Sequence, residues 1–586
     1  MLASFIADNF VPIMFCTLIV ILLTGFPVAF GLAATGLVFG VVGISLDLFP
    51  TNLFQILPLR IFGIMQNETM LAIPFFTLMG IVLERSGMAE DLLETMGQLF
   101  GTMNGGLAIS VILVGALLAA STGVTSAVVI SMGLISLPVM LRYGYNREIA
   151  TGVITASGAM VQALPPSLVL IVMADQLGRS VGDMYAAAIR PGLLLIVVYI
   201  VFIIGVALFS PSKVPALPEH ARIKGTAQGH RGRRSLGMLM LGSTLIGLLW
   251  AGLHNEVMAQ VFSQASGAPS EQVAITALIV ASLSAWSFAM LNRVTGWGVL
   301  SQLAERFVFA LIPPVVLIFL VLGTIFMGIA TPTEGGAMGA VGAMILALLR
   351  RRLSWSLMSQ ALENTAKLAI FVMFILIGST VFSFTFSAAD GHIWVENLFN
   401  VIPGGELGFI IAVCLIIFLL GMFLDFFEIA FIVIPLLIPV ANSLGVDLIW
   451  FGIVIALVLQ TSFLTPPFGF ALLYLRSVAP KHDYVDPATK ALIPGVRTEQ
   501  IWKGSAYFVV LQLIVVGIVV AYPQLVTGGI TKGSVLSDEE IMLQLEGFGS
   551  SSPAVINDFD ELRNPFEQEA ANTADGDPMA ALLGSM

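Results

Sequence analysis

Hydroxyl residues and helix-breaking residues cluster at a few points in a chain that is otherwise apolar. The segment Ser121-Thr122-Gly123-Val124-Thr125-Ser126 combines hydroxyl side chains with a glycine between two apolar runs. Gly123 can adopt a positive φ and close a tight turn, and hydroxyl and carbonyl oxygens suit a hard cation such as Na⁺. We interpret the segment as a hairpin tip that can bind a cation. The alternative interpretation is that Ser and Thr only cap helices and allow close packing.

Two proline pairs, Pro165-Pro166 and Pro466-Pro467, interrupt apolar runs further along the chain. Proline has no backbone N–H, and it moves the preceding residue out of the helical region. The pairs therefore leave some carbonyl oxygens without helical donors, namely those of Val161, Gln162, Ala163, Ser462, Phe463 and Leu464. In lipid, such carbonyls survive only where protein buries them or where they line a cavity. Two equivalent breaks favour a functional role over a simple kink.

Carboxylates are rare in the apolar runs. Asp425 and Glu428 lie in or beside a second candidate tip, where a charge costs about 2.5–3.5 kcal/mol on insertion scales and so defaults to a functional hypothesis. The alternative is that Asp425 lies close enough to the surface to be hydrated. Glu334 follows a proline turn, Thr331-Pro332-Thr333, and we expect it to cap the next helix as an N-terminal acid.

The tips and the breaks belong to two copies of one pattern. Pro138 and Pro439 are 301 positions apart (439 − 138), and the same interval separates Pro165 from Pro466. Each copy therefore contains a tip followed by a helix break in an apolar setting. Paired, interrupted apolar segments in corresponding positions are typical of a secondary transporter.

The composition supports a membrane protein. Of 586 residues, 58% are hydrophobic and only 10% are charged, which predicts a succession of apolar segments long enough to span a bilayer. Cys16 and Cys414 lie in apolar runs, so we infer neither a disulfide nor a metal site from them. The five histidines fall in polar breaks in this interpretation, which argues against a metalloenzyme.

The apolar runs predict an all-α polytopic membrane protein with two inverted-topology repeats. Residues 1–209 form the first repeat, with a re-entrant hairpin at about 105–141 and a broken helix at about 148–177. Residues 210–304 form a basic linker and two extra transmembrane helices. Residues 305–525 form the second repeat, with a hairpin at about 407–441 and a broken helix at about 448–476. Residues 526–586 form an acidic tail that we expect to be disordered.

Positive charge predicts the orientation, because Lys and Arg in short loops stay cytoplasmic. We assume that each hairpin is re-entrant, so that it enters and leaves the membrane on the same side. Placing Arg142 and Arg147 inside then also puts Arg85, the cluster Lys213 to Arg234 and Arg350-Arg351-Arg352 inside. An odd number of crossings then separates the two copies, so the second hairpin faces the periplasm and both termini are periplasmic. No basic n-region precedes the first apolar run, so we expect no cleaved signal peptide.

The motifs resemble the large membrane (M) subunit of tripartite ATP-independent periplasmic (TRAP) transporters. They are Thr331-Pro332-Thr333-Glu334, Gly421-Met422-Phe423-Leu424-Asp425, Leu464-Thr465-Pro466-Pro467-Phe468-Gly469, Ser121-Thr122-Gly123, Leu164-Pro165-Pro166-Ser167, Val181-Gly182-Asp183-Met184 and Arg190-Pro191-Gly192. The resemblance covers about 10–209 and 305–522. It implies an elevator-type symporter of the bacterial inner membrane that is driven by Na⁺ and imports small organic acid anions such as dicarboxylates.

The resemblance also implies sites and partners. It places Na⁺ site 1 between the first tip and the first break, with Ser121, Thr122, Gly123, Ser126, Gln162 and Ala163. It places Na⁺ site 2 between the second tip and the second break, with Gly421, Asp425, Thr461, Ser462, Leu464 and Thr465. The expected partners are a periplasmic substrate-binding protein and a small four-helix membrane subunit, which should be a separate chain because no such extension precedes Met1. No organic cofactor is expected.

Two other functions compete with this interpretation. A stand-alone dicarboxylate carrier or antiporter of the wider ion-transporter group, coupled to Na⁺ or H⁺, also uses paired hairpins and needs no binding protein. A membrane-embedded enzyme would need His, Cys or carboxylate residues that converge within the apolar runs, and the distribution of histidines speaks against one.

Overall fold

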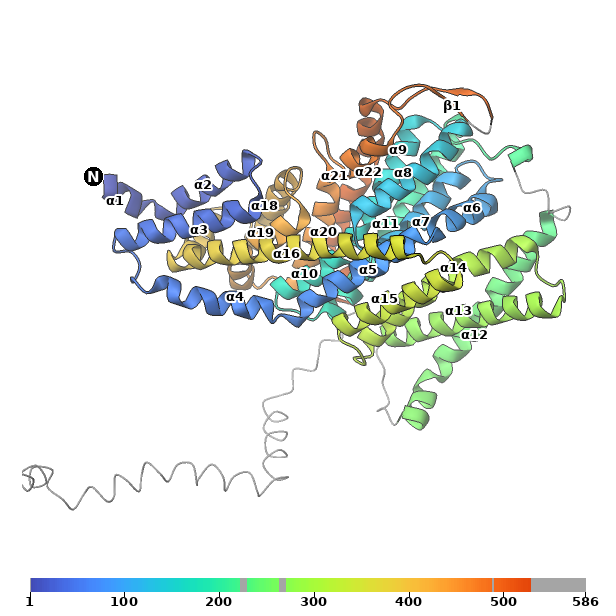
Figure 1. The fold of residues 1–586 in the computed structure, drawn as a ribbon, viewed down its shortest axis with the longest axis horizontal. Helices are drawn as coiled ribbons and strands as arrows, with labels where there is room; N and C mark the ends of the chain where they lie inside the picture. Colours follow the sequence, from blue (N-terminus) through green and yellow to red (C-terminus); the bar gives the residue numbers. More distant parts are fainter. Residues whose placement is uncertain (1, 222–228, 263–269, 487–488, 529–586) are drawn as a thin grey trace, which may run out of the picture. The chain divides into compact units, whose positions relative to one another are not determined.

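The computed structural model describes residues 2–221, 229–262, 270–486 and 489–528, which all belong to one compact unit. Nearly all of the secondary structure is helical (Figure 1). Ten of the described helices are long and apolar enough to cross a membrane, and a bent pair adds an eleventh. The prediction of an all-α polytopic membrane protein is confirmed. The predicted acidic tail lies almost entirely outside the described residues.

The helices follow the predicted apolar runs closely. Those up to residue 221 are α1 Leu2–Asp8, α2 Phe10–Leu23, α3 Val28–Ser45, η1 Leu53–Ile56, α4 Leu57–Met65, η2 Glu68–Leu71, α5 Ala72–Arg85, α6 Met88–Phe100, α7 Gly106–Thr122, α8 Thr125–Arg142, α9 Arg147–Ala159, η3 Met160–Gln162, α10 Leu168–Gln176, α11 Val181–Phe209, η4 Pro211–Lys213 and η5 Glu219–Ala221. The two extra helices are α12 Gly229–Phe262 and α13 Ser270–Thr295.

The remaining elements repeat much of this order. They are α14 Gln302–Phe326, α15 Pro332–Leu349, α16 Trp355–Ala388, α17 Gly391–Asn400, α18 Gly405–Leu420, α19 Phe426–Ser443, α20 Leu448–Ser462, α21 Phe470–Val478, β1 Tyr484–Val485, β2 Leu492–Ile493, α22 Thr498–Ala521 and α23 Gln524–Thr527. The two strands pair antiparallel, with Tyr484 opposite Ile493.

The sequence did not predict every element. The segment Leu53–Arg85 is not one continuous helix: Leu53–Met65 and Glu68–Arg85 meet at an angle of 46°, because Asn67 caps a new turn by accepting a hydrogen bond from the Thr69 N–H at 3.0 Å. The amphipathic helices α6 and α17 were missed because they contain too few consecutive apolar residues. Met88 and Gly391, their first residues, are 303 positions apart (391 − 88), close to the interval of the repeat.

One histidine also corrects the prediction. We expected all five histidines in polar breaks, but α12 continues to Phe262 and buries His254 completely. Its Nδ1 lies 3.1 Å from the hydroxyl of Thr276 on α13. The contact with α13 therefore lets α12 continue through this polar residue.

The packing of the helices exchanges between the two copies. Helix α15 packs along α5, and α3 packs along α16; α22 packs on α9, and α11 on α20; α21 packs on α8, and α10 on α19. In the order of the chain, α3, α5, α8, α9, α10 and α11 of the first copy correspond to α15, α16, α19, α20, α21 and α22 of the second. Exchanging each helix for its counterpart converts the first contact of each couple into the second. This is the pattern that a two-fold relation between the copies would produce.

Charged residues that we predicted on one side of the membrane form contacts between segments that are distant in the chain. Arg350 pairs with Asp91 at 2.6 Å, Arg85 donates to Gln360, and Arg142 pairs with Asp486 at 2.8 Å. The side of the membrane on which these residues lie stays a prediction.

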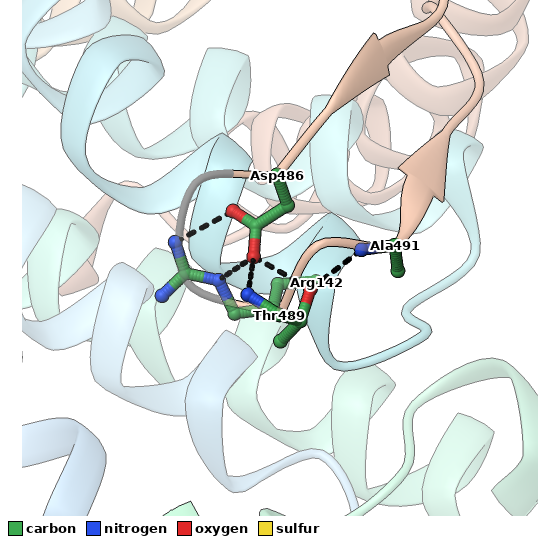
Figure 2. A network of polar contacts seen from close by, with 4 residues as sticks. All are labelled: Arg142, Asp486, Thr489 and Ala491. Carbon is green, nitrogen blue, oxygen red and sulfur yellow. Dashed lines mark hydrogen bonds and ion pairs between the residues drawn. The ribbon is translucent and has the colours of Figure 1, made fainter.

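The Arg142–Asp486 pair joins the base of the first hairpin to the loop after α21 (Figure 2). Arg142 donates through Nε and Nη2 to the two carboxylate oxygens, at 3.0 and 2.8 Å. The backbone N–H and the hydroxyl of Thr489 donate to Oδ2 of the same carboxylate. These donors lower the pKa of Asp486 to about 2. A bidentate, almost buried ion pair of this kind ties two distant parts of the chain together.

We expect Asp486→Asn to lower the thermal unfolding midpoint at pH 7. The folded-state pKa lies below the unfolded value of about 3.9, so the pair stabilises the fold above pH 4 and loses its contribution as the pH falls toward 2. The midpoints of wild type and variant should therefore differ by a constant amount from pH 5 to 8 and converge below pH 4. Glu363→Gln, which removes an exposed pair with Lys367, is the control and should change little. Equal midpoints for wild type and Asp486→Asn at pH 7 would contradict the prediction.

Candidate functional site

The first tip joins α7 to α8. Helix α7 ends at Thr122, and Gly123 follows with φ of 65° in the left-handed region, as expected for a glycine that ends a helix. The hydroxyls of Ser121 and Thr122 donate to the carbonyl oxygen of Leu118 at 3.0 and 2.9 Å. Because their protons are used locally, the lone pairs of both oxygens remain free to face a cation.

The first tip lies directly against the first break. A Cβ built on Gly123 would be 2.9 Å from Cγ of Leu168, the residue that begins α10 after the break. On its other side, a Cβ on Gly80 of α5 would be 2.4 Å from Cα of Thr122. The structure therefore brings Ser121, Thr122 and Gly123 to the start of α10, as predicted, and seats them on α5.

The first break has the free carbonyls that the sequence predicts. The turn η3 ends at Gln162, and the Pro165-Pro166 peptide bond is cis. The N–H groups of Ala163 and Leu164 both donate to Met160. Among the described residues, no donor reaches the carbonyls of Val161, Gln162 or Ala163. These are buried, neutral oxygens of the kind that suit Na⁺.

Gln162 itself is an unusual residue. Its side chain is 1% exposed, and neither its Oε1 nor its Nε2 has a hydrogen-bond partner within the described part of the chain. A buried amide without partners is destabilising by about 1–3 kcal/mol. Such a group in a native fold points to a ligand or ion that completes its bonds.

The second tip lies against the end of α20. A Cβ on Gly421 would be 2.2 Å from Oγ of Ser462, so no side chain fits between them. The hydroxyls of Thr461 and Ser462 donate to Leu457 and Leu459, and that of Thr465 donates to Thr461. The prediction that Gly421, Thr461, Ser462 and Thr465 share one place agrees with this geometry.

The second break differs from the first. The Pro466-Pro467 bond is also cis, but the Ser462 carbonyl accepts from the N–H of Thr465, and the Phe463 carbonyl accepts from the N–H of Ala471 at 3.2 Å. The expectation that both are unpaired is wrong, because the chain folds back at Gly469 and brings Ala471 to Phe463. Of the three predicted carbonyls, that of Leu464 has no donor among the described residues.

Asp425 has a structural role in addition to any contact with a cation. It is half-buried and forms the N-cap of α19, where its N–H donates to the Glu428 carboxylate at 2.9 Å. This bond is half of a capping box. Glu334 closes a similar box with Thr331, which confirms its predicted capping role.

Ser126 and Thr122, two residues of predicted site 1, also border a second space. With Val124 they line a cavity of about 520 Å³ between α8, α5 and α16. The opposite walls carry Thr77, Glu84, Arg85 and Lys367, and Glu84 accepts a hydrogen bond from Ser131 of α8. Gln162 and Ala163 do not line this cavity. The sequence did not predict that Lys367 and Glu84 line this cavity, because both residues are distant in the chain from the two tips.

Gln460 is a second residue that the predicted sites omit. It is 0% exposed, and neither atom of its amide makes a hydrogen bond of normal geometry among the described residues, although the amide lies close enough to the Tyr199 hydroxyl to interact with it. Its helix α20 packs against η3, which carries Gln162. A glutamine inside the apolar run at 448–476 was a usable signal, because polar residues at that depth are expensive.

The donor set favours an alkali cation over a transition metal. No group of three or more His, Cys, Asp or Glu residues that could hold a metal lies within the described part of the chain. Both breaks instead offer neutral carbonyl and hydroxyl oxygens. These residues fit Na⁺, a hard, singly charged cation that requires no carboxylate cluster.

Residues 15–525 match the family described as "Tripartite ATP-independent periplasmic transporter, DctM component". A C4-dicarboxylate TRAP transporter large permease protein from Rhodobacter capsulatus is 28% identical over 517 residues, covering 88% of this chain and 98% of the relative. A protein of the same description from Pseudomonas aeruginosa is 26% identical, covering 74% and 83%. The isethionate TRAP transporter permease protein DctMQ from Oleidesulfovibrio alaskensis is 24% identical, covering 84% and 64%.

Proposed function

This chain belongs to the DctM family of tripartite ATP-independent periplasmic transporters, and on that premise we propose that it is the large permease subunit of a Na⁺-coupled importer of small organic acid anions. One observation supports Na⁺ as the coupling ion. Each of the two hairpin tips lies against one of the two helix breaks, and each break has at least one neutral oxygen without a donor among the described residues. In this proposal, Na⁺ supplies the driving force when bound. The chain's own residues order the tips against the breaks.

Na⁺ site 1 is formed by Ser121, Thr122 and Gly123 with the carbonyls of Gln162 and Ala163. Two contacts support this proposal: Gly123 packs against Leu168 at the start of α10, and α7 packs on η3, which carries Gln162. Ser126 and Thr122 both line the neighbouring cavity. We assign Ser126 to the substrate path, and Thr122 borders both the path and site 1. Na⁺ site 2 is formed by Gly421, Thr461, Ser462, Thr465 and the Leu464 carbonyl, while Asp425 holds the second tip in place through its cap.

The substrate path includes the cavity beside Ser126. Arg85 and Lys367 contribute two positive charges to its lining and Glu84 contributes one carboxylate, while Thr77, Thr122 and Ser126 provide hydroxyls. Such a lining suits a carboxylate or sulfonate. Two relatives are described as transporters of C4-dicarboxylates and a third as a transporter of isethionate, and these compounds are small anions.

Transport occurs by movement of the tips and broken helices as one body against a scaffold. The exchange of packing between the two copies supports inverted repeats. The arms α7 and α18 have 17 and 16 residues, so each is about 25 Å long. This is shorter than the roughly 30 Å of the hydrocarbon core, as re-entrant hairpins require. Both termini face the periplasm in this arrangement.

Two partners complete the transporter: a periplasmic binding protein that delivers the anion and a small membrane subunit. The tripartite family supports this proposal. One relative is described as a DctMQ permease, so the small subunit is either a separate chain, as we propose here, or a fused segment.

Uptake of labelled organic acids into proteoliposomes tests the proposal. With the permease, its small subunit and a candidate binding protein, we expect uptake only when both the binding protein and an inward Na⁺ gradient are present. A K⁺ gradient of equal size is the control. Uptake that proceeds equally without the binding protein would identify a stand-alone carrier instead.

A further inference from the structure

The two extra helices, α12 and α13, pack together and then against α14 (Figure 1). The contacts are close: a Cβ on Gly247 would lie 2.8 Å from the Ala277 carbonyl, and one on Gly323 would lie 3.2 Å from Ile275. The helices therefore form a fixed addition to α14, and they have no counterpart in the repeat. Two cavities lie where they join the rest of the fold.

The first cavity is polar and has a volume of about 540 Å³. Helices α6, α14 and α15 and the end of α13 surround it. Three arginines and three carboxylates line it: Arg293, Arg306, Arg350, Asp91, Glu94 and Glu305. Because the two signs balance, the cavity suits a group that carries both charges rather than a simple anion.

Some of these charges are already held in place. Arg350 pairs with Asp91 at 2.6 Å and donates to the Phe309 carbonyl. The Arg293 guanidinium lies 5.3 Å from the centre of the Phe309 ring. Within the described residues, Arg306 and Glu94 take part in no ion pair. They leave one positive and one negative group available to a ligand.

The second cavity is an apolar crevice of about 260 Å³ between α12 and α13. Met238, Gly242, Ile246, Phe288 and Val299 line it. Met238 is 65% exposed and Val299 is 55% exposed, so the crevice opens toward the surrounding hydrocarbon. A Cβ on Gly242 would meet nothing within 4 Å, which means that this wall has free space in front of it.

One buried side chain organises both cavities. Asn292 is 3% exposed. Its Nδ2 donates to Glu305 at 2.6 Å, at the polar cavity. Its Oδ1 accepts from the N–H groups of Val299 and Leu300, at the crevice, at 3.0 and 3.3 Å. The loop between α13 and α14 therefore forms a shared wall, with a charged space on one side and an apolar space on the other.

We propose that these cavities bind one phospholipid with an ethanolamine headgroup. Its phosphate lies among Arg293 and Arg306, its ammonium donates to Glu94, and one acyl chain occupies the crevice beside Gly242. Pockets with basic residues between transmembrane helices bind lipid headgroups, and the balanced charge selects the zwitterion over an anionic lipid. The lipid fastens the extra helices to α6, α14 and α15.

Native mass spectrometry of the full chain in detergent tests this binding. Phosphatidylethanolamine, phosphatidylglycerol and phosphatidylcholine with the same acyl chains are titrated separately. We expect phosphatidylethanolamine to bind about tenfold more tightly than the others, which corresponds to roughly 1.4 kcal/mol. Phosphatidylcholine lacks the N–H donors that Glu94 requires, and phosphatidylglycerol lacks the cation.

Two variants separate the parts of the site. The first is a double variant, Arg306→Gln with Glu94→Gln, which changes two exposed side chains. It should remove the preference among headgroups. Gly242→Phe should fill the crevice and weaken binding of all three lipids by about tenfold. Gly237→Phe on the same helix, where a Cβ also meets nothing within 4 Å, is the matched control and should bind as wild type. All variants must elute as single species in gel filtration.

Three outcomes would overturn the proposal. Equal binding of the three lipids would indicate non-specific lipid around the helices. Tighter binding of phosphatidylglycerol would contradict the argument from balanced charge. Unchanged binding by Gly242→Phe would exclude the crevice as the place of an acyl chain.

Discussion

Replacing Gln162 or Gln460 by methionine is expected to lower uptake roughly ten- to hundredfold while leaving the protein at least as stable as wild type. Both amides are buried, and neither makes a hydrogen bond of normal geometry among the described residues; the Gln460 amide only lies near the Tyr199 hydroxyl. A hydrogen bond to a charged group contributes about 1.5–3 kcal/mol, so losing one at the moment of binding has an effect of this size.

The gain in stability has the same origin as the loss of function. Methionine has nearly the volume of glutamine and no group that needs a partner, so it removes a penalty of about 1–3 kcal/mol from the unliganded protein. The thermal unfolding midpoint without substrate and Na⁺ should therefore rise or stay equal. Uptake and thermal unfolding are measured on the same preparations.

Gln512 provides the matched control. It is 2% exposed, but its Nε2 donates to the Tyr199 hydroxyl at 2.7 Å, so only its Oε1 lacks a partner within the described part of the chain. Gln512→Met should lose about 1 kcal/mol of stability, the usual value of one hydrogen bond, and keep its uptake. Wild-type uptake by both Gln162→Met and Gln460→Met would show that the unpartnered amides do not act in transport.

Gly421→Ala is expected to reduce uptake to near background. The added Cβ would lie 2.2 Å from Oγ and 3.0 Å from Cβ of Ser462, so the second tip would have to move away from the break. Overpacking of this kind destabilises by about 1–3 kcal/mol, and the unfolding midpoint should fall as well. Uptake with a Na⁺ gradient and thermal unfolding provide the two measurements.

A second substitution tests the steric explanation. Gly421→Ala combined with Ser462→Gly removes the atoms that collide, and it should restore the unfolding midpoint but not uptake, because the Ser462 hydroxyl belongs to proposed site 2. Gly205→Ala on α11, where a Cβ meets nothing within 4 Å, is the control and should transport normally. Normal transport by Gly421→Ala would mean that contact between this tip and α20 is not needed.

The sequence predicted the elements because their causes are local. Lengths of apolar runs place α7, α8 and α9, a glycine closes the first tip at Gly123, and missing N–H groups break the helices at Pro165-Pro166 and Pro466-Pro467. The interval of 301 residues aligned the two copies (466 − 165). Helix capping by Glu334 was also predictable, since a capping box involves residues only three positions apart.

The tertiary structure decided which groups have partners. Whether the Phe463 carbonyl is free depends on Ala471, and whether Ser126 faces a break or a cavity depends on α5 and α16. Burial of His254 depends on α13. The lack of partners around Gln162 and Gln460 follows from the packing of η3 on α20. Propensity acts over a few residues, whereas hydrogen-bond satisfaction depends on neighbours that are hundreds of positions away in the chain.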